Sequence, residues 1–133
     1  PDAMTNYARL ADLPVTKCRD AAALAAQPFD AVVDALYGTG FHGSLRPAGL
    51  AACALMNRQR ESGAFVLAVD LPSGINTDTG EAAEGAVRAD LTVTFDSCKP
   101  LHTAPSSALF CGEIVCADIG IRDEWHPAGL AQL

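Results

Sequence analysis

Basic side chains are scarce in this chain of 133 residues. Lys and Arg together number 9 against 16 Asp and Glu, which gives a net charge of -7 and a pI near 4.7. A protein that wraps a nucleic-acid backbone needs clustered cations to displace counterions, so this balance argues against a nucleic-acid partner. A small molecule fits better. We expect any phosphate on it to be bound by backbone N–H groups and local dipoles.

Signals for secretion, membranes and metal ribbons are also missing. No apolar run approaches the roughly 18 residues of a membrane span, and no charged-then-apolar leader opens the chain. We therefore expect a cytoplasmic protein with no membrane partner. The cysteines are odd in number and form no C-x-x-C pair, which favours reduced, mostly buried thiols; they are Cys18, Cys53, Cys98, Cys111 and Cys116.

Several common catalytic signatures do not occur. The chain has neither the dinucleotide-binding G-x-G-x-x-G nor a P-loop, and Ser73 lacks the G-x-S-x-G setting of a hydrolase nucleophile. His42 and His102 are interpreted as solvated loop residues rather than catalysts. No internal repeat is evident.

What is present is an alternation of strand-like and helix-like segments. Strands are predicted at apolar, β-branched runs: 15–18, 31–36, 65–69, 90–95 and 113–119. Helices are predicted between them at 3–13, 21–27, 47–62 and, as a single turn, 106–110. A loop over 71–87 is long enough to indicate a functional role. Continuous apolar strands joined by helices are typical of a parallel sheet, so we predict one doubly wound α/β domain with right-handed crossovers.

Two of these strands end in an acid followed by a glycine-bearing loop. Asp34 follows the first such strand and Asp70 the second. Ligands collect beyond the carboxyl ends of parallel strands, so we expect both acids on one rim. Two close carboxylates need a cation between them or a shared proton, and Ser73 offers a further oxygen ligand. The alternative left open is that each acid only caps its own turn.

Two further features lie near this rim. The segment Gly38-Thr39-Gly40-Phe41-His42-Gly43-Ser44 can present successive N–H groups to a phosphate, although a plain flexible turn explains it about as well. Lys99 precedes Pro100 and is placed either to reach the same rim or to lie at the surface of a turn.

Several motifs in register resemble the YjeF N-terminal domain, the NAD(P)H-hydrate epimerase family. The resemblance covers about residues 30–121, and the opening helix with Asn6-Tyr7 adds to it less distinctively. The segments that carry it are Val33–Gly40, Ala68–Ile75, Asp78-Thr79-Gly80, Ala89–Phe95, Lys99-Pro100 and Gly112–Ile121.

The resemblance implies a Rossmann-like three-layer α/β/α sandwich with a mostly parallel sheet. The implied activity interconverts the R and S forms of hydrated NADH and NADPH, so that an ADP/ATP-dependent dehydratase, fused or separate, can repair them. A potassium ion belongs to such sites. Asp34 and Ser73 match potassium ligands, and Asp70 matches a substrate-contacting acid, to which we assign the catalytic acid/base role. The substrate-binding positions are Gly38, Thr39, Gly40, Phe41, His42, Gly43, Ser44 and Asp70.

The family's G-x-x-N-x-G-D-G loop is not found in this chain. We therefore expect residues 1–121 to be a partial, amino-terminally truncated epimerase domain that binds substrate poorly alone, with 122–133 as a tail or the start of a linker. A homodimer is a further expectation. The alternatives are a non-catalytic YjeF-type scaffold that dimerises and recognises nucleotide or RNA, and a carrier of another nucleotide-like metabolite.

Overall fold

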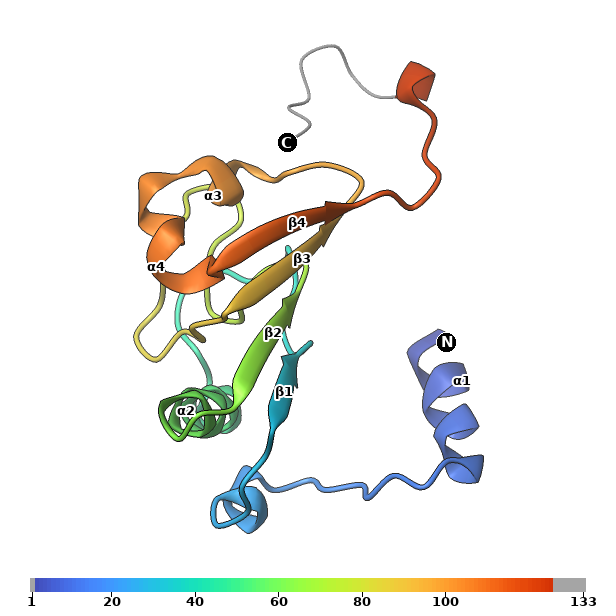
Figure 1. Ribbon diagram of the computed structural model, residues 1–133, viewed down its shortest axis with the longest axis vertical. Coiled ribbons are helices and arrows are strands. Elements are labelled where there is room, and N and C mark those ends of the chain that lie inside the picture. The colour runs from blue at the N-terminus through green and yellow to red at the C-terminus, as the bar shows by residue number, and fades with distance from the viewer. Residues whose placement is uncertain (1, 126–133) are drawn as a thin grey trace.

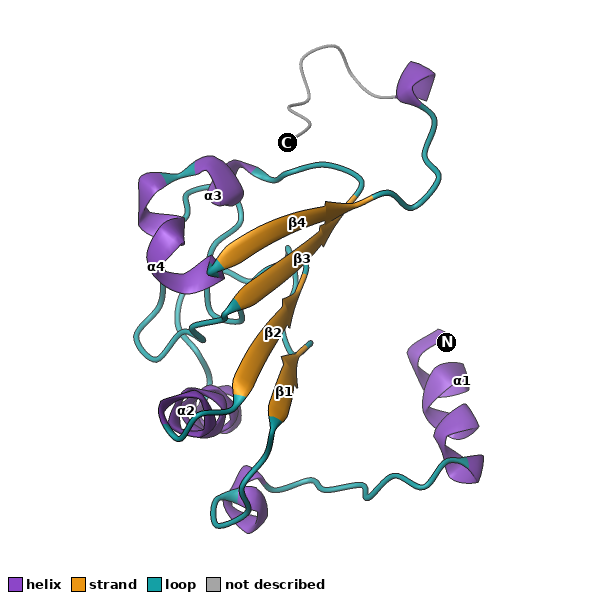
Figure 2. Cartoon of the chain, in the orientation of Figure 1, coloured by secondary structure: helices purple, strands orange, loops and turns teal. Residues whose placement is uncertain are grey.

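The structure is a computed structural model that describes residues 2–125. Its centre is a four-stranded sheet in the order β1-β2-β3-β4, with every neighbouring pair parallel (Figures 1 and 2). The strands are β1 Ala31–Asp34, β2 Phe65–Val69, β3 Leu91–Phe95 and β4 Glu113–Ala117. The predicted α/β class and parallel sheet are confirmed: β2 has the predicted bounds, and the other strands are one or two residues shorter than predicted.

The longest helix, α2 Pro47–Glu61, crosses from β1 to β2. Pro47 occupies its first turn, where a missing N–H leaves no bond unmade. Gly63 ends it with φ of 102°, a conformation that favours glycine. Cys53 and Met56 on its inner side pack against a core whose other buried members are Val66, Ala68, Val87 and Ala89.

The crossover from β3 to β4 is made of short helical pieces. These are α3 Pro100–Thr103, the 3-10 turn η3 Pro105–Ser107 and α4 Ala108–Cys111. They cover a second core cluster formed by Leu71, Ile75, Ala86, Leu101 and Cys111. From the sequence, only one helical turn was predicted here, at 106–110. Segments this short contain too few residues to show the 3.6-residue spacing of apolar positions that indicates a helix.

The helices that cover the sheet lie on one of its faces (Figure 1). The strand order follows the chain order, so every right-handed crossover passes over the same side. A sheet is wound on both faces only where the strand order reverses, and the described strands contain no such reversal. The opposite face carries apolar side chains that remain accessible: Val33, Phe65, Phe95 and Val115.

The amino-terminal segment stands apart from the sheet (Figure 1). It consists of α1 Asp2–Arg9 and η1 Leu10–Asp12, whereas the next 3-10 turn, η2 Ala21–Leu24, contacts α2. None of the α1 residues is buried. The prediction of a strand at 15–18 is wrong, because this stretch is extended but unpaired. Asp20 caps η2 by accepting a hydrogen bond of 2.9 Å from the Ala22 N–H.

The cysteines are free thiols, as expected. Cys53, Cys98 and Cys111 are buried, and burial raises the pKa of Cys53 and of Cys111 to about 11. Within residues 2–125, no helix has the length and apolar character needed to cross a membrane. A short turn, η4 Asp123–Trp125, ends the described part, and the remainder of the tail or linker predicted at 122–133 lies outside it.

Candidate functional site

The first three strands end at one edge of the sheet, and the predicted acids lie there. Asp34 is the last residue of β1 and pairs in register with Ala68. Asp70 follows β2 directly, and its N–H donates a hydrogen bond of 2.8 Å to the Val93 carbonyl of β3. The edge shared by these strands therefore holds both carboxylates, on adjacent strands.

Asp34 is bound to Ser73 through two contacts. The Asp34 carboxylate accepts a hydrogen bond of 2.7 Å from the Ser73 N–H and one of 2.6 Å from the Ser73 hydroxyl. The same hydroxyl accepts a bond of 3.0 Å from the Tyr37 N–H. Asp34 is 1% exposed and Ser73 is fully buried. Ser73 thus joins the loop after β2 to the loop after β1.

The buried Asp34 carboxylate has no cationic partner among the described residues. Their ion pairs join Arg60 to Asp90, Lys99 to Asp70, and Arg122 to Glu124. A buried carboxylate is costly unless it is paired or fully hydrogen-bonded. Its neighbours supply hydroxyl oxygen, which a hard cation prefers. Within residues 2–125, no three His, Cys, Asp or Glu side chains gather into a metal site, and the oxygen atoms of Asp34 and Ser73 are the donors that this edge of the sheet offers to a cation.

Asp70 has different partners. Its Oδ1 atom lies 2.7 Å from the Lys99 ammonium and accepts a hydrogen bond of 2.9 Å from the Thr94 hydroxyl. The ammonium also donates to that hydroxyl at 2.8 Å and to the Phe95 carbonyl at 3.0 Å. Lys99 therefore reaches the rim, which was one of the two positions predicted for it from the sequence. The two acids lie on one rim, but each carboxylate is held by its own set of neighbours.

His102 joins this group, and its interpretation as a solvated loop residue is wrong. The side chain is buried, with 7% exposed, inside α3. Its Nε2 lies 2.9 Å from the Asp70 carbonyl, and its Nδ1 accepts a hydrogen bond of 3.0 Å from the Lys99 N–H. Burial lowers the pKa of His102, since the charged ring loses its water, and the nearby Lys99 ammonium acts in the same direction.

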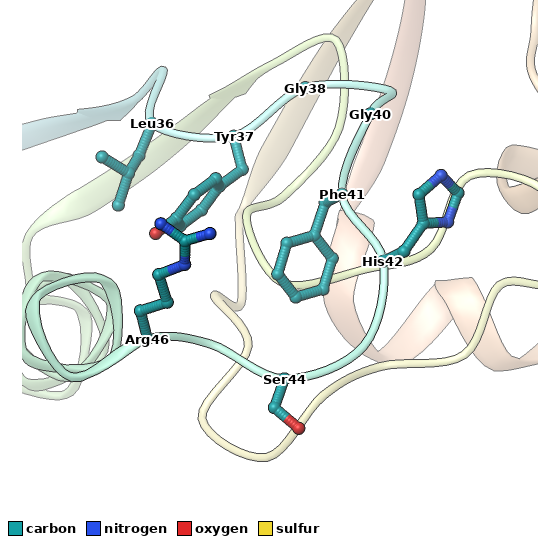
Figure 3. A pocket seen from close by; sticks show the side chains of 8 residues that line it. All are labelled: Leu36, Tyr37, Gly38, Gly40, Phe41, His42, Ser44 and Arg46. Atoms are coloured by element: carbon teal, nitrogen blue, oxygen red, sulfur yellow. The ribbon is translucent and has the colours of Figure 1, made fainter.

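The predicted substrate loop, residues 38–44, borders a pocket of about 440 Å³. In Figure 3 the Phe41 ring points into the curve of this loop and His42 points away from it. The Phe41 ring packs at 5.5 Å from the Tyr37 ring, and Arg46 brings a guanidinium from the start of α2. The residues lining the pocket are Leu36, Tyr37, Gly38, Gly40, Phe41, His42, Ser44 and Arg46.

Two contacts hold this loop against the long loop after β2. The Thr77 hydroxyl donates to the Thr39 carbonyl at 3.3 Å. The Asn76 amide donates to His42 Nδ1 at 3.1 Å. His42 is exposed, as its sequence interpretation held. The two predicted loops therefore lie side by side.

Sequence reasoning missed four residues of this region: Tyr37, Arg46, Thr94 and His102. A signal existed for Thr94, because a hydroxyl on the buried face of a strand needs a nearby partner. His102 stands three residues after Lys99 at the start of a helix, the spacing at which a side chain bonds back to the residue before the helix.

Comparison with known proteins identifies the family to which the chain is similar. Residues 1–101 match the family described as YjeF-related protein N-terminus. The chain is 45% identical over 103 residues to the bifunctional NAD(P)H-hydrate repair enzyme Nnr of Methanothermobacter thermautotrophicus, covering 77% of this chain and 19% of that protein. It is 39% identical over 127 residues to the NAD(P)H-hydrate epimerase of Pirellula staleyi, covering 90% of this chain and 55% of that protein.

The chain thus spans about a fifth of the length of such bifunctional relatives and about half of that epimerase. The family match extends over the acid-ended strands β1 and β2, both glycine-bearing loops and Lys99. On these grounds the chain belongs to the family of YjeF-related protein N-termini.

Proposed function

We propose that the protein containing this chain epimerises hydrated NADH and NADPH, interconverting their R and S forms. The observation that carries the proposal is the Asp70 carboxylate, anchored through Oδ1 by Lys99 and Thr94 at the carboxyl end of the sheet. The relatives named as NAD(P)H-hydrate epimerases and repair enzymes support it. Their names favour catalysis over the non-catalytic nucleotide or RNA scaffold.

The reaction needs one positioned acid/base. The Asp70 carboxylate takes up a proton from solvent and passes it to the hydroxyl on the hydrated ring carbon, the C–O bond breaks, and water leaves. The cationic ring that remains is stabilised by its own nitrogen. Water then adds to the opposite face and returns a proton to Asp70, so atoms and charge balance. Proton transfer by a positioned group contributes a factor of roughly 10² to 10⁴. Oδ2 takes no part in the Lys99 and Thr94 contacts, and we assign it the proton transfer.

Asp34 and Ser73 would hold a potassium ion at the adjacent strand end. A bound cation there supplies fixed positive charge for an anionic substrate and for the buried Asp34 carboxylate. Ser73 keeps the loops after β1 and β2 in contact through Asp34 and Tyr37.

The segment 38–44 would bind the substrate, with Asp70 contacting its ring. A Cβ added at glycines 38, 40 or 43 would meet open space, and the lack of side chains there allows a phosphate to approach the backbone N–H groups closely. Arg46 at the border of the pocket adds a charged donor suited to the same phosphates.

The proposal extends to setting and partners. The epimerase domain would comprise residues 1–121, work in the cytoplasm and act with an ADP/ATP-dependent dehydratase, fused or separate. It would form a homodimer. The relatives named as bifunctional repair enzymes support a fused arrangement.

The experiment is a rate assay on the whole protein that contains this chain. Pure R or S hydrated NADPH is supplied, and the opposite form is measured by chromatography. We expect Asp70→Asn to lower the epimerisation rate by a factor of about 10² to 10⁴ while leaving the fold intact. Glu84→Gln removes an exposed acid from the long loop after β2 and serves as the control with an unchanged rate. Retention of the full rate by Asp70→Asn contradicts the assignment.

A further inference from the structure

Asp70 has a backbone conformation that its neighbours must hold. Its φ is 70°, in the left-handed region that side chains with a Cβ rarely adopt. Such a conformation persists only where the surroundings over-determine it. The N–H of Asp70 is held by Val93, and its carbonyl by His102. The strained turn therefore depends on a contact from α3.

Lys99 is anchored at both its ends. Its ammonium has three N–H donors, and three acceptors surround it: Asp70 Oδ1, Thr94 Oγ1 and the Phe95 carbonyl. Its backbone N–H donates to His102 Nδ1. A fully engaged ammonium orients Asp70 rather than supplying a proton itself.

The contacts of His102 fix its tautomer. A backbone N–H can only donate, so Nδ1, which faces the Lys99 N–H, is the unprotonated acceptor. A carbonyl can only accept, so Nε2, which faces the Asp70 carbonyl, carries the proton. The ring is the neutral Nε2–H form, and both of its nitrogens bond to main chain.

Filling the core does not account for this arrangement. The adjacent Leu101 is fully buried in the apolar cluster with Leu71 and Ile75. His102 lies beside it but directs its two ring nitrogens to the two residues whose side chains form the ion pair. An apolar side chain of the same volume would leave both main-chain groups unbonded.

We propose that His102 is a positioning residue: as the Nε2–H tautomer it ties the main chains of Asp70 and Lys99 together and so sets the direction of their ion pair at the sheet edge. The chemical benefit of this positioning rests on the proposed epimerisation. The two hydrogen bonds of His102 can be measured without any assay of the reaction.

The test uses two variants that each keep half of the contacts. In His102→Gln, the side-chain amide nitrogen falls near the position of Nε2 and still donates to the Asp70 carbonyl. In His102→Asn, the amide oxygen falls near Nδ1 and still accepts from Lys99, but the donor to Asp70 is lost. A displacement of a reacting group by about 1 Å costs on the order of 10²-fold in rate. Either variant breaks the tie, so we expect kcat to fall in both with KM little changed: by about that factor in His102→Asn, which loses the contact to the Asp70 turn, and by less in His102→Gln, which keeps it.

The second readout is nuclear magnetic resonance on the whole protein. The ¹⁵N shifts of His102 should report an unprotonated Nδ1 and a protonated Nε2. The ¹³C shift of the Asp70 carboxyl should move in both variants, and further in His102→Asn than in His102→Gln.

A protonated Nδ1, an unmoved Asp70 signal in His102→Asn, or equal kcat values for wild type and both variants would each overturn the positioning role. If the wild-type protein shows no epimerisation, the proposed function fails, and the resonance measurements alone decide the positioning role.

Discussion

Asp34 ends β1 and Asp70 directly follows β2, but the two carboxylates have different surroundings. Asp34 is buried and bonded to Ser73, whereas Asp70 is half-buried and paired with Lys99. The sequence could place both acids on one rim because parallel strands end at the same edge. It could not assign their partners, because Thr94 and His102 come to the site from later elements whose packing no local pattern encodes.

Ser73 is the residue whose loss should disturb the rim most widely. Ser73→Ala removes a buried hydroxyl that donates to Asp34 and accepts from Tyr37. We expect a loss of about 1–3 kcal/mol in the free energy of unfolding, because the buried Asp34 carboxylate and the half-buried Tyr37 N–H each lose a bond. Urea unfolding measures it. Ser62→Ala, at an exposed position after α2, is the matched control and should change little.

The titration of His102 gives a prediction with a definite sign. Burial lowers the folded-state pKa below the ordinary 6.5, so the unfolded chain binds this proton more readily. The contribution to stability is therefore complete above about pH 6.5 and is lost as the pH falls through the lowered value. Asp70 and Lys99 are the charged groups that face the ring.

The check is the difference in free energy of unfolding between wild type and His102→Gln. It should shrink between about pH 7 and pH 5, because only the wild type has this titration. A difference that stays constant over this range would show that His102 does not titrate as described.

At the scale of elements, the strands were the most predictable part. Continuous apolar runs located β1 to β4 because β1, β2 and β4 carry apolar side chains on the face toward the helices, β3 is rich in β-branched residues, and each strand is followed by a glycine or acid turn. The segment 15–18 has the composition of a strand but finds no partner. Strand formation requires a neighbour, and a single segment carries no information about one.

The junction between α4 and β4 depends on a glycine. Gly112 has φ of 61°, and a Cβ there would press on the Asp90 carbonyl. Gly63, after α2, also has positive φ, but open space surrounds it. We expect Gly63→Ala to cost about 1–3 kcal/mol from backbone strain alone. Gly112→Ala should cost clearly more in the same thermal or urea unfolding, and equal losses would show that the close approach does not matter.

At the scale of the whole molecule, the described residues form a sheet with helices on one side. The α/β class could be predicted because the order of strands and helices fixes it. The placement of the helices on one face could not be predicted, because it follows from the strand order. Strand order is set by contacts between segments that are distant in the sequence. The apolar side chains on the other face, such as Phe65 and Val115, are a consequence of that order.

A cation held by Asp34 and Ser73 should stabilise the whole protein by mass action. Potassium at about 100 times its dissociation constant would add about 2.7 kcal/mol to the free energy of unfolding. Thermal unfolding in potassium chloride against choline chloride at equal ionic strength measures this. Asp34→Asn should abolish the increment, while Asp30→Asn, an exposed acid just before β1, should keep it. If Asp34→Asn keeps the same increment in stability, potassium does not bind at this position.

The central claim is that Asp70 passes a proton while a ring hydroxyl is lost and regained at this edge of the sheet. The most direct measurement supplies one pure epimer of hydrated NADPH in water labelled with ¹⁸O and determines by mass spectrometry which oxygen the inverted product carries. We expect ¹⁸O in the inverted product formed by the wild-type protein, and its near-absence over the same time with Asp70→Asn. Inverted product that keeps its original oxygen, or that forms equally fast with Asp70→Asn, would contradict it.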